Sequence, residues 1–149
     1  FQGARDWYEE KGIPYRRGMA LYGPPGTGKT STAIALANAM DMDLYIINFT
    51  GITAVGLREA FSTKNCMILI EDIDASTQSL NTRSEEEKDS KQGKIEFLTL
   101  SDILNAIDGV MTGTNIIFLV TTNHLDKIDP ALLRPGRIDR LFERHRSYF

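Results

Sequence analysis

Four short apolar runs, separated by stretches with helical spacing, are the feature that most restricts how this chain can fold. The runs are GMALY (18–22), LYIINF (44–49), MILI (67–70) and IIFLVT (116–121). Each reads as a strand buried on both faces. The helical patterns cover residues 29–40, 54–62 and 98–107. Strands that alternate with helices predict an α/β fold, with a parallel sheet, right-handed crossovers and helices on both faces.

The length of 149 residues is enough for one domain with a sizeable core. A net charge of −3 provides no overall positive field to attract nucleic acid or anionic lipid. No stretch approaches the ~20 apolar residues that span a bilayer, and no signal peptide is visible, so we expect this stretch itself to be soluble. The single cysteine, Cys66, opens an apolar run. We interpret it as a buried, inert thiol rather than a reactive one.

One segment, residues 76–94, breaks the alternation. Its sequence, STQSLNTRSEEEKDSKQGK, has no aromatic residue and one apolar residue, Leu80. This composition cannot bury enough apolar surface to offset the entropy of ordering, which predicts a mobile insert. A regulatory or partner-binding segment is the alternative.

The segment GPPGTGKT, residues 23–30, fits the pattern G-x-x-x-x-G-K-[ST] between a predicted strand and a predicted helix. Its glycines let backbone amides turn toward one anion at a helix N-terminus. In such a loop the lysine reaches the β- and γ-phosphates, while the hydroxyl of the last residue ligates Mg²⁺. The simpler alternative is a Gly/Pro turn before a helix. The residues that we expect to bind the nucleotide are Gly23, Pro24, Pro25, Gly26, Thr27, Gly28, Lys29, Thr30 and Ser31.

Three acids, Glu71, Asp72 and Asp74, follow the apolar run in ILIEDIDA, residues 68–75. Burying a carboxylate is costly unless something positive compensates it. In a P-loop NTPase, an acid that ends a neighbouring apolar strand helps to hold Mg²⁺. We therefore predict that the cation is Mg²⁺, although a solvated acidic loop would show the same residues. Alternation along a strand gives Glu71 and Asp72 different directions and so different roles.

The order and spacing of GPPGTGKT, ILIEDIDA, TTN and DPALLRPGRIDR resemble those of AAA ATPases. Within them, WYEEKGIPYRRGMALYGPPGTGKT, LSDILNAIDGV and TTNHLDKIDPALLRPGRID look most like the mitochondrial complex III assembly chaperone family, which translocates the Rieske iron–sulfur protein. The resemblance covers nearly all of residues 6–140 except the insert. It implies an AAA-type P-loop NTPase core over residues 1–149, a sheet order of 5-1-4-3-2, and ATP with Mg²⁺.

The resemblance also suggests roles for the polar strand ends. Most AAA proteins end the acidic strand with Asp then Glu, whereas this chain has Glu71 then Asp72, as in the chaperone family. By position, Glu71 supports Mg²⁺ with Thr30, and Asp72 orients or deprotonates the attacking water. Asp72 is one methylene shorter than the Glu that most AAA proteins have at this position. The opposite assignment, with Asp72 at the metal and Glu71 at the water, therefore stays open. Asn123 corresponds to the polar sensor near the γ-phosphate, or else is an Asx-turn residue. Asp74 is expected to be structural.

Arg134 and Arg137 in LLRPGRIDR match the arginine fingers of the family. Such fingers neutralise charge that develops on phosphoryl oxygens, and in AAA rings the neighbouring subunit supplies them. The resemblance therefore implies a homo-oligomeric ring, a heptamer in the similar chaperones. Two surface arginines beside a Pro-Gly turn are the alternative.

Residues 50–58 occupy the place of the pore loop in peptide-threading AAA proteins, yet no aromatic lies between Phe49 and Phe61. A chain-gripping pore is therefore not expected. By resemblance we expect remodelling or translocation of a protein client at the mitochondrial inner membrane. Contact with the membrane would come only through an anchor outside this sequence, and the C-terminal helical lid of the family would also lie outside it.

Two other functions are compatible with the same motifs. One is a nucleic-acid motor or clamp-loader-like ATPase, which the net charge and the lack of a basic, aromatic-interleaved stretch disfavour. The other is a nucleotide-dependent scaffold that does not hydrolyse ATP. The full set of Lys29, Thr30, Glu71, Asp72 and Asn123 disfavours the scaffold. We expect no nucleic-acid partner.

Overall fold

The computed structural model describes residues 3–13, 15–47, 53–74, 100–108 and 115–146. The predicted insert at 76–94 lies outside the described residues, as do the first part of the 50–58 loop and the ends of two predicted elements. None of the helices within the described ranges is long and apolar enough to cross a membrane.

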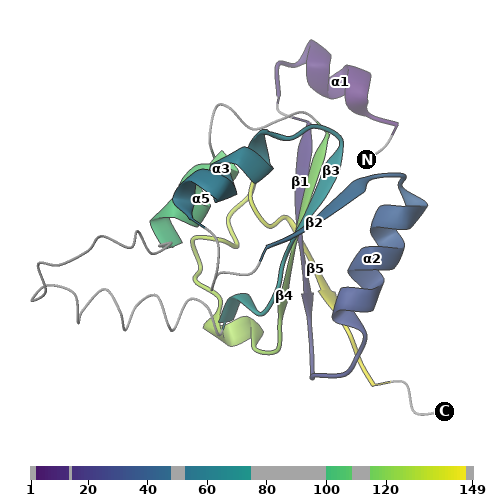
Figure 1. The fold of residues 1–149 in the computed structure, drawn as a ribbon, viewed down its shortest axis with the longest axis vertical. Coiled ribbons are helices and arrows are strands. Elements are labelled where there is room, and N and C mark those ends of the chain that lie inside the picture. Colours follow the sequence, from purple (N-terminus) through teal and green to yellow (C-terminus); the bar gives the residue numbers. More distant parts are fainter. Residues whose placement is uncertain (1–2, 14, 48–52, 75–99, 109–114, 147–149) are drawn as a thin grey trace, which may run out of the picture.

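The described elements alternate along the chain as predicted (Figure 1). The strands are β1 (Arg16–Tyr22), β2 (Asp43–Ile47), β3 (Cys66–Ile70), β4 (Ile116–Thr122) and β5 (Arg140–Glu143). The helices are α1 (Arg5–Glu10), α2 (Lys29–Ala39), α3 (Ala54–Ser62), α5 (Leu100–Asp108) and the 3₁₀-helix η2 (Leu125–Lys127). Three elements, α1, η2 and β5, do not correspond to any predicted range, although the sheet order from the resemblance implied a fifth strand. All three are short and carry charged residues, so none shows a buried periodicity.

The five strands form one parallel sheet in the order β2-β3-β4-β1-β5. This is the predicted order 5-1-4-3-2 read from the other edge, so the prediction is confirmed. Strand β4 lies at the centre, where all seven of its residues are buried, between β3 and β1. Because the strands are parallel, their carboxyl ends meet at one edge of the sheet, where ligands bind in open α/β folds.

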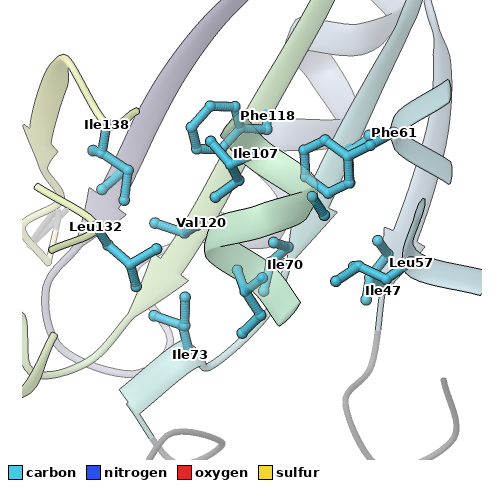
Figure 2. Close-up of a cluster of buried hydrophobic side chains, with 14 of the residues drawn as sticks. Ile47, Leu57, Phe61, Ile70, Ile73, Ile107, Phe118, Val120, Leu132 and Ile138 are labelled. Carbon is cyan, nitrogen blue, oxygen red and sulfur yellow. The ribbon is translucent and has the colours of Figure 1, made fainter. Parts of the chain in front are cut away.

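Helices cover both faces of the sheet, with α3 and α5 on one face and α2 on the other (Figure 1). Alternation within β3 divides the core accordingly: Ile68 and Ile70 pack in the α3/α5 cluster, whereas Met67 and Leu69 pack on the α2 side. In the larger cluster the Phe61 ring lies 6.2 Å from that of Phe118 (Figure 2). The runs that became β3 and β4 are buried throughout, as predicted. The run that became β2 is not: of its residues only Ile47 is buried, because β2 lies at the edge of the sheet, so the prediction of a strand buried on both faces was wrong there.

The helix after the phosphate loop packs with small residues. Ala33 and Ala37, one turn apart on α2, are almost fully buried against the sheet. Alanine lets a helix approach a sheet closely and costs no side-chain entropy on burial. Packing therefore fixes the axis of α2 and the position of its N-terminus.

Candidate functional site

The loop GPPGTGKT joins β1 to α2 at the carboxyl edge of the sheet. Gly26 and Gly28 both have φ of +77°, a left-handed conformation that side chains with a Cβ rarely adopt. Gly23 is required for a different reason, since a Cβ there would lie 2.2 Å from the carbonyl oxygen of Arg144 after β5. The Thr27 hydroxyl closes the loop by donating to the Pro24 carbonyl at 2.9 Å. The loop thus leads into the first turn of α2, where backbone amides have no partner within the helix and can face an anion.

Lys29 is buried in the loop and joins it to the end of β4. Its Nζ donates to the carbonyl oxygens of Gly23 at 2.8 Å and Pro24 at 3.1 Å. It also donates to Oδ1 of Asn123 at 2.8 Å. A buried ammonium needs such oxygens, and these three contacts hold the cation at the centre of the site.

The hydroxyl of Thr30, in the first turn of α2, donates to Oε1 of Glu71 at 2.6 Å. Glu71 follows the last residue of β3, so a helix start and a strand end meet here. A hydroxyl beside a carboxylate is an oxygen donor set of the kind that Mg²⁺ binds together with water and phosphates. The oxygens of Thr30 and Glu71 fit Mg²⁺, which usually binds one or two protein groups and keeps several waters. Among the described residues no group of three or more His, Cys, Asp or Glu side chains could hold a metal.

Asp72 turns away from its neighbour. Its φ of +46° is left-handed, and its backbone N–H donates to the Thr121 hydroxyl at 3.1 Å. Its Oδ1 accepts a long hydrogen bond of 3.5 Å from Nδ2 of Asn123. Lys29, Asn123 and Asp72 therefore form a chain of contacts that is separate from the Thr30–Glu71 pair.

These side chains surround one cavity of about 320 Å³. Its lining residues are Pro25, Gly26, Gly28, Lys29, Thr30, Ser31, Glu71, Asp72, Thr121 and Asn123. The structure thus brings together most of the predicted nucleotide-binding residues, both acids and the sensor asparagine. Thr121 was not predicted as a site residue. One feature of the sequence could have indicated it: Thr121 is a hydroxyl residue at the end of the predicted apolar run, directly before the polar Thr122 and Asn123.

The third acid, Asp74, is buried outside this cavity lining. Its Oδ1 accepts a hydrogen bond from the Thr122 hydroxyl at 2.8 Å, and Thr122 in turn accepts one from the backbone N–H of His124 at 2.9 Å. This network ties the turn after β3 to the turn after β4. It agrees with the structural role expected for Asp74, and the His124 side chain is exposed.

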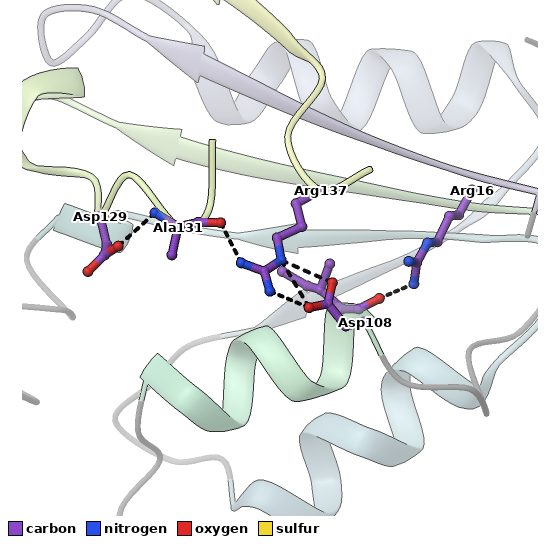
Figure 3. Close-up of polar contacts among 6 residues, drawn as sticks. Arg16, Asp108, Asp129, Ala131 and Arg137 are labelled. Carbon is purple, nitrogen blue, oxygen red and sulfur yellow. Dashed lines mark hydrogen bonds and ion pairs between the residues drawn. The ribbon is translucent and has the colours of Figure 1, made fainter. Parts of the chain in front are cut away.

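Neither predicted arginine finger lines the cavity of its own chain. Arg134 is exposed. The guanidinium of Arg137 pairs with the Asp108 carboxylate through Nε at 3.0 and 3.1 Å and through Nη2, and its Nη1 donates to the Ala131 carbonyl at 2.5 Å (Figure 3). These hydrogen bonds, with the charge of Arg137, hold the pKa of Asp108 below its ordinary value.

A second arginine reaches the same helix end. Nη1 of Arg16, at the start of β1, donates to the carbonyl oxygen of Ile107 (Figure 3). Positive groups at a helix C-terminus offset its partial negative charge and pair with its unsatisfied carbonyls. The end of α5 is therefore held by Arg16 from the sheet and by Arg137 from the turn that carries both predicted fingers.

Comparison with known proteins places the chain among ATPases. A profile described as "ATPase family associated with various cellular activities (AAA)" matches residues 19–146. The chain is 43% identical over 137 residues to "Probable mitochondrial chaperone bcs1" of Schizosaccharomyces pombe, which covers 89% of this chain and 29% of that protein. It is 41% identical over 137 residues to the human "Mitochondrial chaperone BCS1", covering 89% of this chain and 32% of that one. An AAA-ATPase of Arabidopsis thaliana is 42% identical over 149 residues, 93% of this chain and 28% of its own length. The chain thus spans about a third of the length of the curated relatives that it matches.

Proposed function

This chain belongs to the AAA family of ATPases, and from that membership we propose that it hydrolyses ATP with Mg²⁺ at the cavity between α2, β3 and β4. The observation that carries the proposal is the convergence of Lys29, the Thr30–Glu71 pair and the Asp72–Asn123 pair at one edge of the sheet. The arrangement provides a cation to bind phosphate, oxygen ligands to hold a metal, and a carboxylate to accept a proton from water. ATP hydrolysis needs these three functions.

The phosphates of ATP are bound by the loop amides and by Lys29, which exchanges loop carbonyl partners for phosphate oxygens. Thr30 and Glu71 would hold Mg²⁺, and that ion would supply positive charge to offset the charge of the phosphates. Asp72 accepts the proton of the attacking water, and Asn123 orients that water from its position between Lys29 and Asp72. Nδ2 of Asn123 lies 3.5 Å from Oδ1 of Asp72, so the group that orients the water adjoins the group that accepts its proton.

The proposed arginine fingers act between subunits of a homo-oligomeric ring. Arg134, exposed on its own chain, is the group that reaches the phosphates of a neighbouring cavity. Arg137 is held by Asp108 within its own chain. It acts in trans only if a phosphate oxygen replaces that carboxylate, and otherwise it holds the turn on which Arg134 stands.

We propose that the ring remodels a protein client or translocates it across a membrane. The support is the similarity to proteins named mitochondrial chaperones, which also supports a mitochondrial location. Within mitochondria, the location that we propose is the inner membrane. Expression of the full-length protein with a fluorescent tag, followed by fractionation of mitochondria, tests the location. Recovery of the protein outside mitochondria would contradict it.

Lys29→Ala tests the proposed chemistry directly. The variant removes the only buried cation of the loop, so we expect binding of a slowly hydrolysed ATP analogue to be lost in isothermal titration. Lys64→Ala is the matched control. Lys64 is exposed just before β3, so it lies at the end of that strand that is away from the cavity. An unchanged affinity in Lys29→Ala would exclude the nucleotide site proposed here.

A further inference from the structure

The backbone bends sharply between the two adjacent acids. Glu71 has its Oε1 2.6 Å from the Thr30 hydroxyl, whereas the Oδ1 of Asp72 faces Asn123. The bend is the left-handed conformation of Asp72, with φ of +46°. Most residues with a Cβ adopt this conformation rarely, whereas Asp does so more readily. A hydrogen bond to the Asp72 backbone would favour this bend over the other conformations open to Asp.

The Thr121 hydroxyl makes that contact. The paired register of β3 with β4 ends at Ile70 and Val120. Two residues beyond the ladder, the Asp72 N–H donates instead to Oγ1 of Thr121 at 3.1 Å. Thr121 is 2% exposed, and β-branching restricts its side-chain rotation. A buried and rigid hydroxyl is well suited to hold a backbone amide in one place.

The neighbouring threonine has different partners. Thr122 donates to Asp74, accepts from the backbone N–H of His124, and does not line the cavity. Adjacent residues of a strand face opposite sides of the sheet. Of the two neighbouring threonines, therefore, Thr121 is the one whose hydroxyl lies on the cavity side with Asp72.

We propose that Thr121 is a positioning residue for ATP hydrolysis. Its hydroxyl fixes the backbone of Asp72 so that this carboxylate faces the attacking water, while Glu71 stays with Thr30 at the metal position. The inference rests on the proposed function, since it assigns Asp72 as the acceptor of the water's proton. Thr121 acts through the backbone of Asp72, so its loss should lower the hydrolysis rate and leave ATP binding in place.

Three substitutions in the full-length, assembled protein test this role. Thr121→Val keeps the shape and removes the acceptor, Thr121→Ala removes it without overpacking, and Thr121→Ser keeps a hydroxyl. We expect kcat to fall about 10- to 100-fold in the first two variants, since a misplaced general base loses part of its effect. We expect Thr121→Ser to remain within about threefold of the parent. The affinity for a slowly hydrolysed ATP analogue and its Mg²⁺ dependence should stay within a few fold in all three.

Thr63→Val is the matched control, because the Thr63 hydroxyl also bonds to a backbone group, the Glu59 carbonyl at 3.3 Å, but lies outside the cavity lining. Its kcat should equal that of the parent. An unchanged kcat in Thr121→Val and Thr121→Ala, an equal loss in Thr121→Ser, or a parallel loss of ATP affinity would each overturn the positioning role. Asp72→Asn, measured alongside, distinguishes a failure of the inference about Thr121 from a failure of the proposed role of Asp72. If it abolishes hydrolysis while the Thr121 variants do not, only this inference fails; if it hydrolyses ATP normally, the proposed role of Asp72 fails.

Discussion

Replacing Gly18 with alanine should displace the turn that carries both proposed fingers. Gly18 is a buried residue of β1, and its carbonyl accepts a hydrogen bond from the N–H of Asp139 at 3.0 Å. A Cβ at position 18 would lie 1.7 Å from the carbonyl oxygen of Arg137 and 2.2 Å from Cζ of Phe118. The first distance is about half of the 3.4 Å at which ordinary contact begins. The obstacle is backbone on one side and a buried ring on the other, so neither can give way by rotating a flexible side chain.

The cost should reach or exceed the upper end of the range for overpacking, about 3 kcal/mol. For a domain of this size that corresponds to a fall in Tm of roughly 6–12 °C. Thermal and urea unfolding measure the loss, and a steady-state ATPase assay of the assembled protein should show a lower rate with little change in ATP affinity. Gly3→Ala is the control, because a Cβ at Gly3 would meet nothing within 4 Å. A Gly18→Ala variant within about 0.5 kcal/mol of the parent would refute the close approach of the turn to β1.

Three further predictions address the acids and the thiol. Asp72→Asn should bind MgATP without hydrolysing it, whereas Glu71→Gln should weaken the Mg²⁺ dependence of binding; ATP trapped by Glu71→Gln would exchange the two roles. Asp108→Asn should cost about 0.5–1 kcal/mol in urea unfolding at pH 7, because Asp108 is partly exposed in its pair with Arg137. The lowered pKa of Asp108 means that this contribution is present above about pH 4 and is lost as the pH falls through the native pKa, so a difference that persists at pH 2 would contradict it. Burial raises the pKa of Cys66 to about 11, so alkylation of the native thiol at pH 8 should be at least roughly a hundredfold slower than in urea, and equal rates would show that the thiol is accessible.

The sequence predicted the parts of the fold whose signal is local. The run from Cys66 to Ile70 is apolar without interruption and became a fully buried strand. Strand β5, by contrast, has only the sequence RLFE with every residue exposed. It exists because its backbone pairs with β1, and no pattern within four residues could indicate that pairing. The order of the strands came from the family resemblance and not from periodicity.

In the candidate site, too, residues with a local sequence signal could be predicted, and contacts between distant residues could not. Lys29 and Thr30 could be predicted because a phosphate loop places its functional groups at fixed spacing. The contact of Asp108 with Arg137 joins residues 29 positions apart, and that of Asp72 with Thr121 joins residues 49 apart. The first pairing follows from the packing of α5 against the turn that carries Arg137, and the second from the alignment of β3 with β4, so both appear only once the elements are in place. The same holds for the distinction between exposed Arg134 and paired Arg137.

The parallel sheet also gives an experimenter a place to attach a probe. The polar groups of the cavity lie at the carboxyl edge of the sheet, on strand ends and on the first turn of α2, whereas Lys64 is exposed just before the amino end of β3. The five residues of β3 rise about 16 Å between these two ends. A cysteine introduced as Lys64→Cys could be labelled with a maleimide dye while the single native thiol stays buried. Such a dye would report the assembly of subunits by energy transfer without touching the chemistry of the nucleotide.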